Sequence, residues 1–309
     1  MRESIQELLG SYQIRKTKKQ KQAFIQWLEN HATKHGYEIK KDDYSQDGTN
    51  LIVGNPREAS LYLTAHYDTP ANLFIPIIAG LNPLGFALSQ LYLVAIMYFP
   101  LLILVWGIGL LNIDPMIIAL VQAVMFFGYS LSLLHFVDKV PNKNNANDNT
   151  SGVSVLLALL EDLKPGERAE ICFVFFDEEE KGLVGSQAFK KNYKVKNTPL
   201  INFDCVANGE HLVFVAKKSF RESALGRYFI ENKNQYPRLN IVNASTNIYA
   251  SDQIIFKNSL GVASKKKAPI FGYYFDRIHS HRDTIFDNQN IEDLNVMMKD
   301  LLANVSNND

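Results

Sequence analysis

Acidic and histidine side chains recur at the ends of several apolar segments of this sequence. His66 and Asp68 follow the apolar run SLYLTA, and Asp148 comes directly before a predicted helix. The other clusters are Asp177, Glu178, Glu179 and Glu180 after ICFVFF, Asp204 after LINF, and His279, His281 and Asp283 within RIHSHRDT. Carboxylates and imidazoles that converge in one place suit a borderline divalent metal such as zinc. The spacing alone does not say which carboxylates bind the metal and which one acts as a base.

Each of these features also has a simpler explanation when it is taken alone. A single histidine in a core is more often structural, and an adjacent pair of glutamates is more often a solvated surface. Here the glutamates follow a buried strand, and independent clusters of histidine and aspartate follow other predicted strands. The combination therefore favours metal binding.

Strands and helices alternate along the polar parts of the chain. Apolar runs predict strands over 50–54, 60–66, 170–179 and 199–206, and the first two are expected to form a hairpin across a proline-containing turn. Helical patterns cover 3–35, 151–163, 183–193, 223–232 and 291–305, and another helix is expected to begin in 251–259. The alternation predicts an α/β fold of three layers (αβα) with a central mixed, mostly parallel sheet. In such sheets, chemistry collects at the carboxyl ends of the strands.

An uncharged block interrupts this pattern. Between Thr69 and Ile113 there is no Asp, Glu, Lys, Arg or His, and residues 84–111 and 115–137 are each long enough to cross a bilayer. The tight polar turn NIDP joins them, and Tyr92, Tyr98 and Trp106 are aromatic residues of the interfacial type. A buried hairpin or a dimerisation arm is the alternative, but core helices usually carry a polar face. The block therefore predicts a transmembrane hairpin, and the shorter stretch 73–80 is expected at the interface or as a re-entrant segment.

Charge places the polar parts relative to the membrane. The NIDP turn carries no Lys or Arg, whereas Arg57, Lys139, Lys143 and the run RKTKKQK lie on the other side of the apolar block. Positive residues stay cytoplasmic, so we expect an integral protein of the cell membrane with two spans and its catalytic domain in the cytoplasm.

Composition excludes other classes of protein. The 32 basic and 32 acidic residues cancel, which argues against nucleic-acid binding. Only two cysteines are present, Cys172 and Cys205, and both lie in strand-like runs, so no disulfide framework is expected. The N-terminal segment lacks the apolar core of an export signal. The sequence leaves the oligomeric state open.

Six motifs occur in an order that resembles a known family. They are AHYD, NDNTSG, EEKGLVGS, NFD, SDQIIFKNSLGV and HSHRDT. Together they resemble the di-zinc aminopeptidases of metallopeptidase family twenty-eight, whose relatives include bacterial leucyl aminopeptidase, glutamate carboxypeptidase and glutaminyl cyclase. The resemblance covers roughly residues 45–68 and 144–303. It implies a peptidase domain in two parts, 1–72 and 141–309, with the membrane hairpin inserted as 73–140.

The resemblance also implies a role for each matching residue. It implies two Zn²⁺, or another divalent metal, held by His66 and Asp204, by Glu180 and His279, and by Asp148, which would bridge both ions. Asp68 would hold the far ring nitrogen of His66. Glu179 would act as the general base toward a water that bridges the metals.

The sequence departs from the family pattern in several places. Glu178 adds a third carboxylate before the expected pair, and Gln253 stands where the family has a histidine. His281 competes with His279 as the last ligand, although the spacing to Asp283 favours His279. The largest departure is the apolar insertion, which separates His66 from the ligands that follow it.

The expected function is therefore a membrane-anchored zinc exopeptidase, an aminopeptidase that removes N-terminal residues of peptides. A carboxypeptidase or dipeptidase, a glutaminyl-cyclase-like acyl transferase, and a non-catalytic scaffold on the same fold are the alternatives. Because ligands lie on both sides of the insertion, the chain must cross the bilayer an even number of times between them. A cleft this close to the membrane suits hydrophobic peptides, such as fragments left by intramembrane proteolysis. Lys265, Lys266 and Lys267 are expected to lie in a solvated loop, and contact with lipid headgroups or with a substrate carboxylate is the alternative.

Overall fold

The computed structural model describes residues 1–73, 75, 77–136, 139–164 and 170–305. The helices are α1 (Glu3–Ser11), α2 (Lys18–Lys34), α3 (Pro83–Gly109), α4 (Pro115–Phe136), α5 (Thr150–Asp162), α6 (Val184–Asn192), α7 (Lys218–Arg221), α8 (Ala224–Glu231) and α9 (Asn288–Val305). The strands are β1 (Ile39–Asp43), β2 (Thr49–Val53), β3 (Leu61–His66), β4 (Ala79–Gly80), β5 (Ile171–Phe176), β6 (Leu200–Phe203), β7 (His211–Ala216), β8 (Leu239–Asn243), β9 (Ser259–Ala268) and β10 (Gly272–Phe275). Short 3₁₀ turns are η1 (Glu179–Lys181), η2 (Lys233–Gln235) and η3 (Asp252–Ile255).

One mixed sheet organises the polar part of the chain. Its order is β1-β2-β5-β3-β6-β9-β10-β4, and β7 pairs with β8 and with β9. The central strands β5, β3, β6 and β9 are parallel to one another, whereas β2 joins β5 and β10 joins β9 in antiparallel fashion. The predicted α/β class with a mixed sheet is confirmed. The parallel centre brings the carboxyl ends of β3, β5 and β6 to the same edge.

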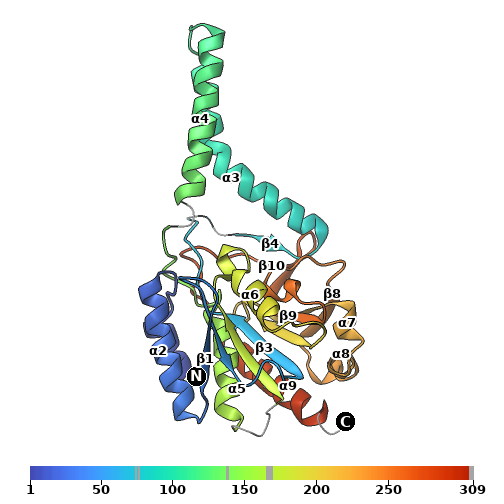
Figure 1. Cartoon of the computed structure of the whole chain (residues 1–309). Helices are drawn as coiled ribbons and strands as arrows, with labels where there is room; N and C mark the ends of the chain where they lie inside the picture. Colours follow the sequence, from blue (N-terminus) through green and yellow to red (C-terminus); the bar gives the residue numbers. More distant parts are fainter. Residues whose placement is uncertain (74, 76, 137–138, 165–169, 306–309) are drawn as a thin grey trace.

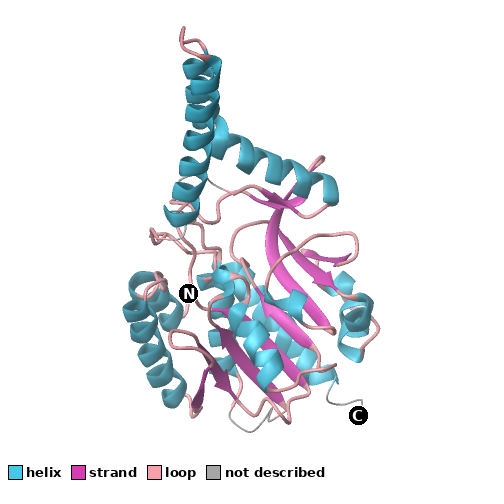
Figure 2. Ribbon diagram, turned by 45° about the horizontal axis from the view of Figure 1, so that its top comes forward, coloured by secondary structure: helices cyan, strands magenta, loops and turns pink. Residues whose placement is uncertain are grey.

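Helices cover both faces of the sheet and make three layers (Figure 2), and buried apolar side chains fill the space on each face. On one face the side chains of α1, α2, α5 and α9 pack against the sheet, and α5 is buried along almost its whole length. On the other face Phe189 of α6 packs with Tyr62, Phe176 and Phe256. Aromatic side chains bury large apolar areas, so both faces of the sheet are anchored by rings.

The predicted hairpin between residues 50–54 and 60–66 is wrong. β2 and β3 do not pair with each other, because β5 lies between them and pairs with both. Every residue of β5 is buried. A strand that is apolar on both faces belongs in the centre of a sheet, and this requirement outweighs the local turn signal.

Two smaller expectations also need correction. The N-terminal segment forms two helices rather than one, because the chain leaves helical geometry before Thr17, which caps α2 together with Gln20. Residues 252–255 form only the 3₁₀ turn η3 instead of a full helix.

The apolar block forms a helical hairpin that projects from the body (Figure 1). Two helices, spanning Pro83–Gly109 and Pro115–Leu133, are long and apolar enough to cross a membrane, and almost none of their residues are buried. Their polar groups face each other: Tyr129 donates to the Met97 carbonyl at 2.6 Å, and Gln122 donates to the Val105 carbonyl at 3.0 Å. Hydrogen bonds of this kind join helices in an apolar solvent. Val137, the predicted end of the second span, lies outside the described residues.

The insertion leaves and rejoins the body at one place. The Asn72 amide donates to the Val140 carbonyl at 2.8 Å, and the Asn142 amide donates to the Pro70 carbonyl at 3.1 Å. β4 then pairs with β10, and Asn82, the N-cap of α3, donates to the Ile270 carbonyl at 3.0 Å. The base of α3 is therefore fixed to the β9–β10 region. In the stretch 73–80, Phe74 and Pro76 lie outside the described residues, and Ala79–Gly80 form β4.

Candidate metal centre and pocket

The histidines and carboxylates singled out in the sequence meet at one edge of the sheet. His66 ends β3, Asp148 precedes α5, Asp204 follows β6, Glu179 and Glu180 begin η1 after β5, and His279 lies in the loop after β10. Their ligand atoms fall into groups that lie within 4.8 Å of one another. Two of these groups are His66, Asp148 and Asp204, and Asp148, Glu180 and His279.

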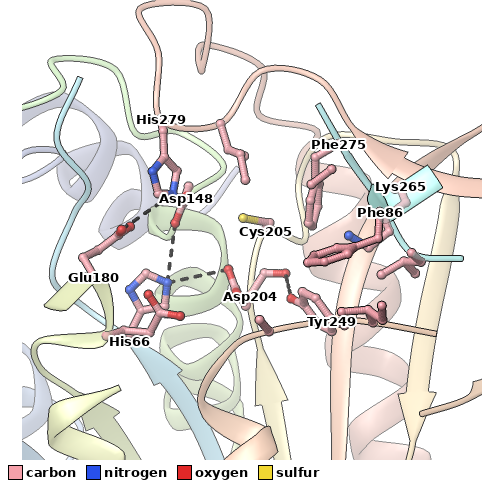
Figure 3. Close-up of a pocket in the computed structure, with 17 residues that line it drawn as sticks. His66, Phe86, Asp148, Glu180, Asp204, Cys205, Tyr249, Lys265, Phe275 and His279 are labelled. Carbon is pink, nitrogen blue, oxygen red and sulfur yellow. Dashed lines mark hydrogen bonds and ion pairs between the residues drawn. The ribbon is translucent and has the colours of Figure 1, made fainter. Parts of the chain in front are cut away.

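Asp148 lies between the two histidines (Figure 3). Its Oδ1 is 3.5 Å from Nε2 of His66, and its Oδ2 is 3.1 Å from Nε2 of His279. Asp204 lies 3.6 Å from the same nitrogen of His66, and Glu180 lies 3.6 Å from that of His279. Each oxygen of Asp148 thus faces a different group of donors, which is the arrangement that a bridging carboxylate requires.

Asp68 connects the two sides of this centre. Its Oδ1 is 3.4 Å from Nδ1 of His66, and its carbonyl oxygen is 3.1 Å from the same nitrogen. Its carboxylate also accepts the backbone N–H groups of Glu179 at 3.1 Å and Glu180 at 3.2 Å. A partner at Nδ1 fixes the orientation of an imidazole and leaves Nε2 free for a metal. Asp68 therefore positions both His66 and the glutamate pair.

Backbone geometry separates Glu178 from the two glutamates that follow it. Glu178 has a left-handed conformation (φ 56°), and its carboxylate accepts from Lys181 at 2.8 Å and Tyr44 at 3.2 Å. Asp177 likewise turns away and forms an ion pair with Lys21. Glu179 and Glu180 group with His66 instead. The structure thus places the second and third glutamates at the centre.

Asp283 and Asn149 hold Asp148 in place. The Asp283 carboxylate accepts the N–H groups of Asn147 and Asp148, both at 2.9 Å. Asn149 donates to the Phe203 carbonyl at 3.0 Å and accepts from the Cys205 amide at 3.2 Å, so it ties the start of α5 to the end of β6. The Asn149 bridge was not predictable from the sequence, because its partners are backbone groups far away in the chain.

The two candidate histidines of the last motif occupy different environments. Nε2 of His279 faces Asp148 and Glu180, whereas His281 is exposed and its carbonyl accepts from Asn144 at 2.7 Å. Of these two histidines, His279 therefore lies at the centre and His281 does not.

The carboxylates of the centre lie close together and are stabilised by positive charge. Burial raises the pKa values of Glu179 and Glu180 well above their usual range, and neighbouring carboxylates raise them further. Oε1 of Glu180 and Oδ1 of Asp204 are buried and make no hydrogen bond within the described part of the chain. A buried carboxylate oxygen that makes no hydrogen bond is costly unless it is paired or binds a metal. Divalent cations therefore fit this set of donors.

A cavity of about 140 Å³ opens beside the centre. Its second wall is largely apolar and is made by Leu81, Phe86, Ile248, Tyr249, Ala250, Phe275 and Ile278. Tyr249 donates to the Asp204 carbonyl at 2.9 Å. Phe86 belongs to α3, so a helix of the apolar hairpin contributes directly to the cavity. Sequence reasoning missed this wall, since its residues come from segments that carry no motif.

The prediction that Lys265, Lys266 and Lys267 lie in a solvated loop is wrong. All three belong to β9, and side chains alternate between the two faces of a strand. Lys265 is fully buried and lines the cavity, Lys266 pairs with Asp276 at 2.6 Å, and Lys267 is exposed. Burial lowers the pKa of Lys265 to about 7.

Comparison with known families agrees with the motifs. The family model described as peptidase family M28 matches residues 134–304, which is more than half of the chain. The chain belongs to peptidase family M28. The match includes Asp148, Glu179, Glu180, Asp204 and His279, whereas His66 and Asp68 precede it. The insertion separates these two residues from the matched region.

Solved structures share the fold of this M28 family member. A Zn-dependent exopeptidase from Parabacteroides distasonis is 15% identical, with a TM-score of 0.61 and coverage of 97% of this chain and 95% of that chain. Glutaminyl cyclase from Porphyromonas gingivalis is 17% identical, with a TM-score of 0.59 and the same coverage of both chains. LapA from Legionella is 15% identical, with a TM-score of 0.52 and coverage of 97% and 71%. No curated protein matches the chain.

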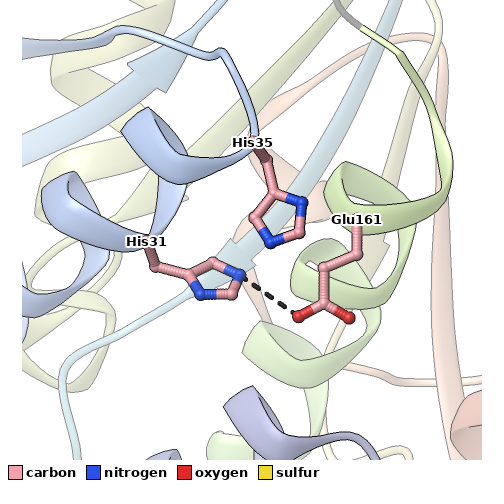
Figure 4. Close-up of side chains that lie close together, drawn as sticks. All are labelled: His31, His35 and Glu161. Atoms are coloured by element: carbon pink, nitrogen blue, oxygen red, sulfur yellow. Dashed lines mark ion pairs between the residues drawn. The ribbon is translucent and has the colours of Figure 1, made fainter.

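A second group of potential ligands in this M28 family member has a structural explanation. His31, His35 and Glu161 lie close together between α2 and α5 (Figure 4). Glu161 is already engaged, because His31 lies at 3.2 Å, Arg2 donates at 3.1 Å, and Ser4 donates a short hydrogen bond. Burial opposes ionisation, but these three partners lower the pKa of Glu161 to about 2. The group joins α1, α2 and α5 rather than forming an open set of donors.

Proposed function

We propose that this protein is a zinc-dependent exopeptidase that removes the N-terminal residue of peptides. The observation that carries the proposal is the pair of donor groups that share Asp148. The proposed ligands are His66 and Asp204 for one zinc ion, Glu180 and His279 for the other, and Asp148 for both. Zinc bound there would lower the pKa of a water molecule and polarise the peptide carbonyl.

Glu179 is the proposed general base. It belongs to the group with His66 and Glu180, and Asp68 fixes its backbone N–H at 3.1 Å. A carboxylate in this position takes the proton of the attacking water and passes it to the nitrogen of the leaving amine. Asp68 would act as a positioning residue, since it contacts His66 and the backbone of the glutamate pair but no reacting atom.

The size and charge of the cavity support cleavage at a chain end. A volume of about 140 Å³ is well below the roughly 300–1,000 Å³ of pockets that hold drug-sized ligands. The cavity therefore accommodates about one residue. Glu179 lines one wall and is assigned no metal, so its carboxylate would attract a free α-amine, which is a cation, to that side.

We expect zinc-loaded protein to cleave Leu-Ala-Ala-amide from its N-terminus, and we expect acetylation of that N-terminus to lower kcat/KM at least about a hundredfold. Mass spectrometry of the products measures both. Chelation should abolish the cleavage, and added zinc should restore it. Release of C-terminal residues from acetyl-Leu-Ala-Ala, which has a free C-terminal carboxylate, would instead show a carboxypeptidase. Cyclisation of Gln-Ala-Ala-amide without release of an amino acid would show a cyclase, and inactivity toward every peptide would favour a scaffold.

We also propose that residues 73–140 anchor the protein in the cell membrane, with the bilayer around α3 and α4. Trp106 and Met116 expose 69% and 82% of their surface, which is unusual for such residues in water. The hairpin turn carries no Lys or Arg, and Lys139 and Lys143 follow α4. This distribution favours a cytoplasmic catalytic domain.

Thiol labelling tests this topology. Cys172 and Cys205 are buried, so a cysteine introduced at an exposed position is the expected reactive thiol. In intact cells, a membrane-impermeant maleimide should label Asn112→Cys in the hairpin turn but should not label Lys143→Cys. Permeabilisation should expose both. The reverse pattern would contradict the orientation, and recovery of the unmodified protein in the soluble fraction would contradict the anchor.

The contribution of Phe86 to the cavity supports hydrophobic, membrane-derived peptides as substrates, because α3 brings the bilayer-facing hairpin to the cavity wall. No nucleic-acid partner is proposed. Apolar peptides bound to vesicles should be cleaved more efficiently than short soluble peptides with the same first residue, and a clear preference for the soluble peptides would count against this substrate class.

A further inference from the structure

Lys265 is a buried amine on the side of the cavity that lies across from the metal donors. β9 places it there, its side chain is fully buried, and its Nζ makes no hydrogen bond to any residue that the structure describes. In Figure 3, Lys265 lies beside Phe275 and Phe86, away from Glu180 and His279. The proposed reaction does not use this amine.

The protein compensates the charge of Lys265 only in part. Nζ lies 2.8 Å from the ring centroid of Phe275 and 4.7 Å from that of Tyr249. Aromatic rings stabilise a desolvated cation, but by less than the burial of an ion costs. The neighbouring Lys266 differs, because Asp276 pairs with it at 2.6 Å. Lys265 has no such carboxylate among the described residues, so its position suits an anionic group brought by a ligand.

The lining of the cavity defines the shape of such a ligand. Glu179, which is assigned no metal, attracts an amine at one end, Lys265 attracts an anion at the other, and apolar side chains such as Leu81 and Ile248 also line the cavity. A cavity of about 140 Å³ has room for about one residue. An N-terminal glutamate or aspartate has these features, because it carries an α-amine and a carboxylate on a short aliphatic stem.

We propose that Lys265 binds a carboxylate of the substrate and thereby selects peptides that begin with an acidic residue. This inference rests on the proposed exopeptidase function and names its substrate class. The same chemistry is available from the C-terminal carboxylate of a dipeptide, but the size of the cavity favours the side chain of the first residue. The selection concerns the first residue only, so the remainder of the peptide is free to be apolar.

The test compares matched peptides on full-length, detergent-solubilised, zinc-loaded protein. For the wild type, we expect kcat/KM for Glu-Ala-Ala-amide to exceed that for Gln-Ala-Ala-amide at least about tenfold, since the two side chains differ by one charge. Lys265→Met should bring this ratio to within about threefold of unity. Lys267→Met, which removes an exposed lysine from the same strand, should leave the ratio unchanged. The kcat/KM ratio of Leu-Ala to Leu-Ala-amide tests the other source of a carboxylate. If this ratio is large in the wild type and falls to about unity in Lys265→Met, Lys265 binds the C-terminal carboxylate of a dipeptide instead.

The outcomes separate this inference from the proposed function. Hydrolysis of Leu-Ala-Ala-amide together with equal rates for the glutamate and glutamine peptides would overturn the role of Lys265 and leave the exopeptidase intact. If no peptide is hydrolysed, calorimetric binding of free glutamate and free glutamine still decides the matter. A preference for glutamate that disappears in Lys265→Met supports the inference, and equal binding contradicts it. If Lys265→Met does not fold, Lys265→Gln, which keeps a polar group, is used in its place.

Discussion

Glu179→Gln is expected to lower kcat about a thousandfold while the protein keeps its full zinc content. General acid–base catalysis contributes about 10²–10⁴-fold to a rate, and Glu179 is the one glutamate of the group to which we assign no metal. Glutamine has the same shape, and its backbone N–H still reaches Asp68. Steady-state kinetics on zinc-loaded protein, together with metal analysis of the same sample, measure both quantities.

The neighbouring Glu178 supplies a matched control for this prediction. Glu178→Gln removes a carboxylate one residue away, but that carboxylate contacts Lys181 and Tyr44 outside the metal centre. We expect less than about a threefold change in kcat. An equal loss of activity in both variants, or full activity in Glu179→Gln, would mean that the base lies elsewhere.

Asp148→Asn is expected to remove most of the bound zinc and, with it, the activity. The two oxygens of Asp148 face His66 and His279 separately, at 3.5 and 3.1 Å, so both ions lose a ligand. An amide offers one neutral acceptor oxygen and a nitrogen that does not bind zinc, so it cannot replace a bridging carboxylate. Zinc content per chain after dialysis against a weak chelator measures the effect.

Asp204→Asn is the comparison for this second prediction. Asp204 belongs to only one of the two donor groups that contain Asp148, the one with His66. The substitution of Asp204 should therefore weaken the binding of one zinc ion and leave the other ion bound. Equal zinc loss in the two variants would argue against a shared ligand at position 148.

The ordered motifs identified the metal centre from the sequence, because most of its residues stand next to a predicted strand. His66, Asp204 and the glutamates each lie at the end of an apolar strand or directly after it, and parallel strands bring such ends together. Asp68 was also predictable, since it lies two residues beyond His66. The roles assigned to these residues remain predictions, whereas their proximity is a property of the fold.

The features that the sequence did not reveal depend on distant partners. β2 pairs with β5 and not with β3, because β5 is buried on both faces and lies between them. The residues of the turn between β2 and β3 carry no information about this burial. The three lysines of β9 resemble a surface run. The pleat of the strand sends Lys265 and Lys266 to opposite faces, and burial decreases from Lys265, which lines the cavity, to Lys267, which is exposed near the end of the strand. Phe86 reaches the cavity because Asn82 fixes the base of α3 to the turn after β9.

Anomalous diffraction at the zinc edge, from crystals of the full-length protein, would locate the metal ions themselves. We expect two peaks, one beside His66 and Asp204 and the other beside Glu180 and His279, with the Asp148 carboxylate contacting both. A single peak, no peak at this edge of the sheet, or zinc bound instead by His31, His35 and Glu161 would contradict it.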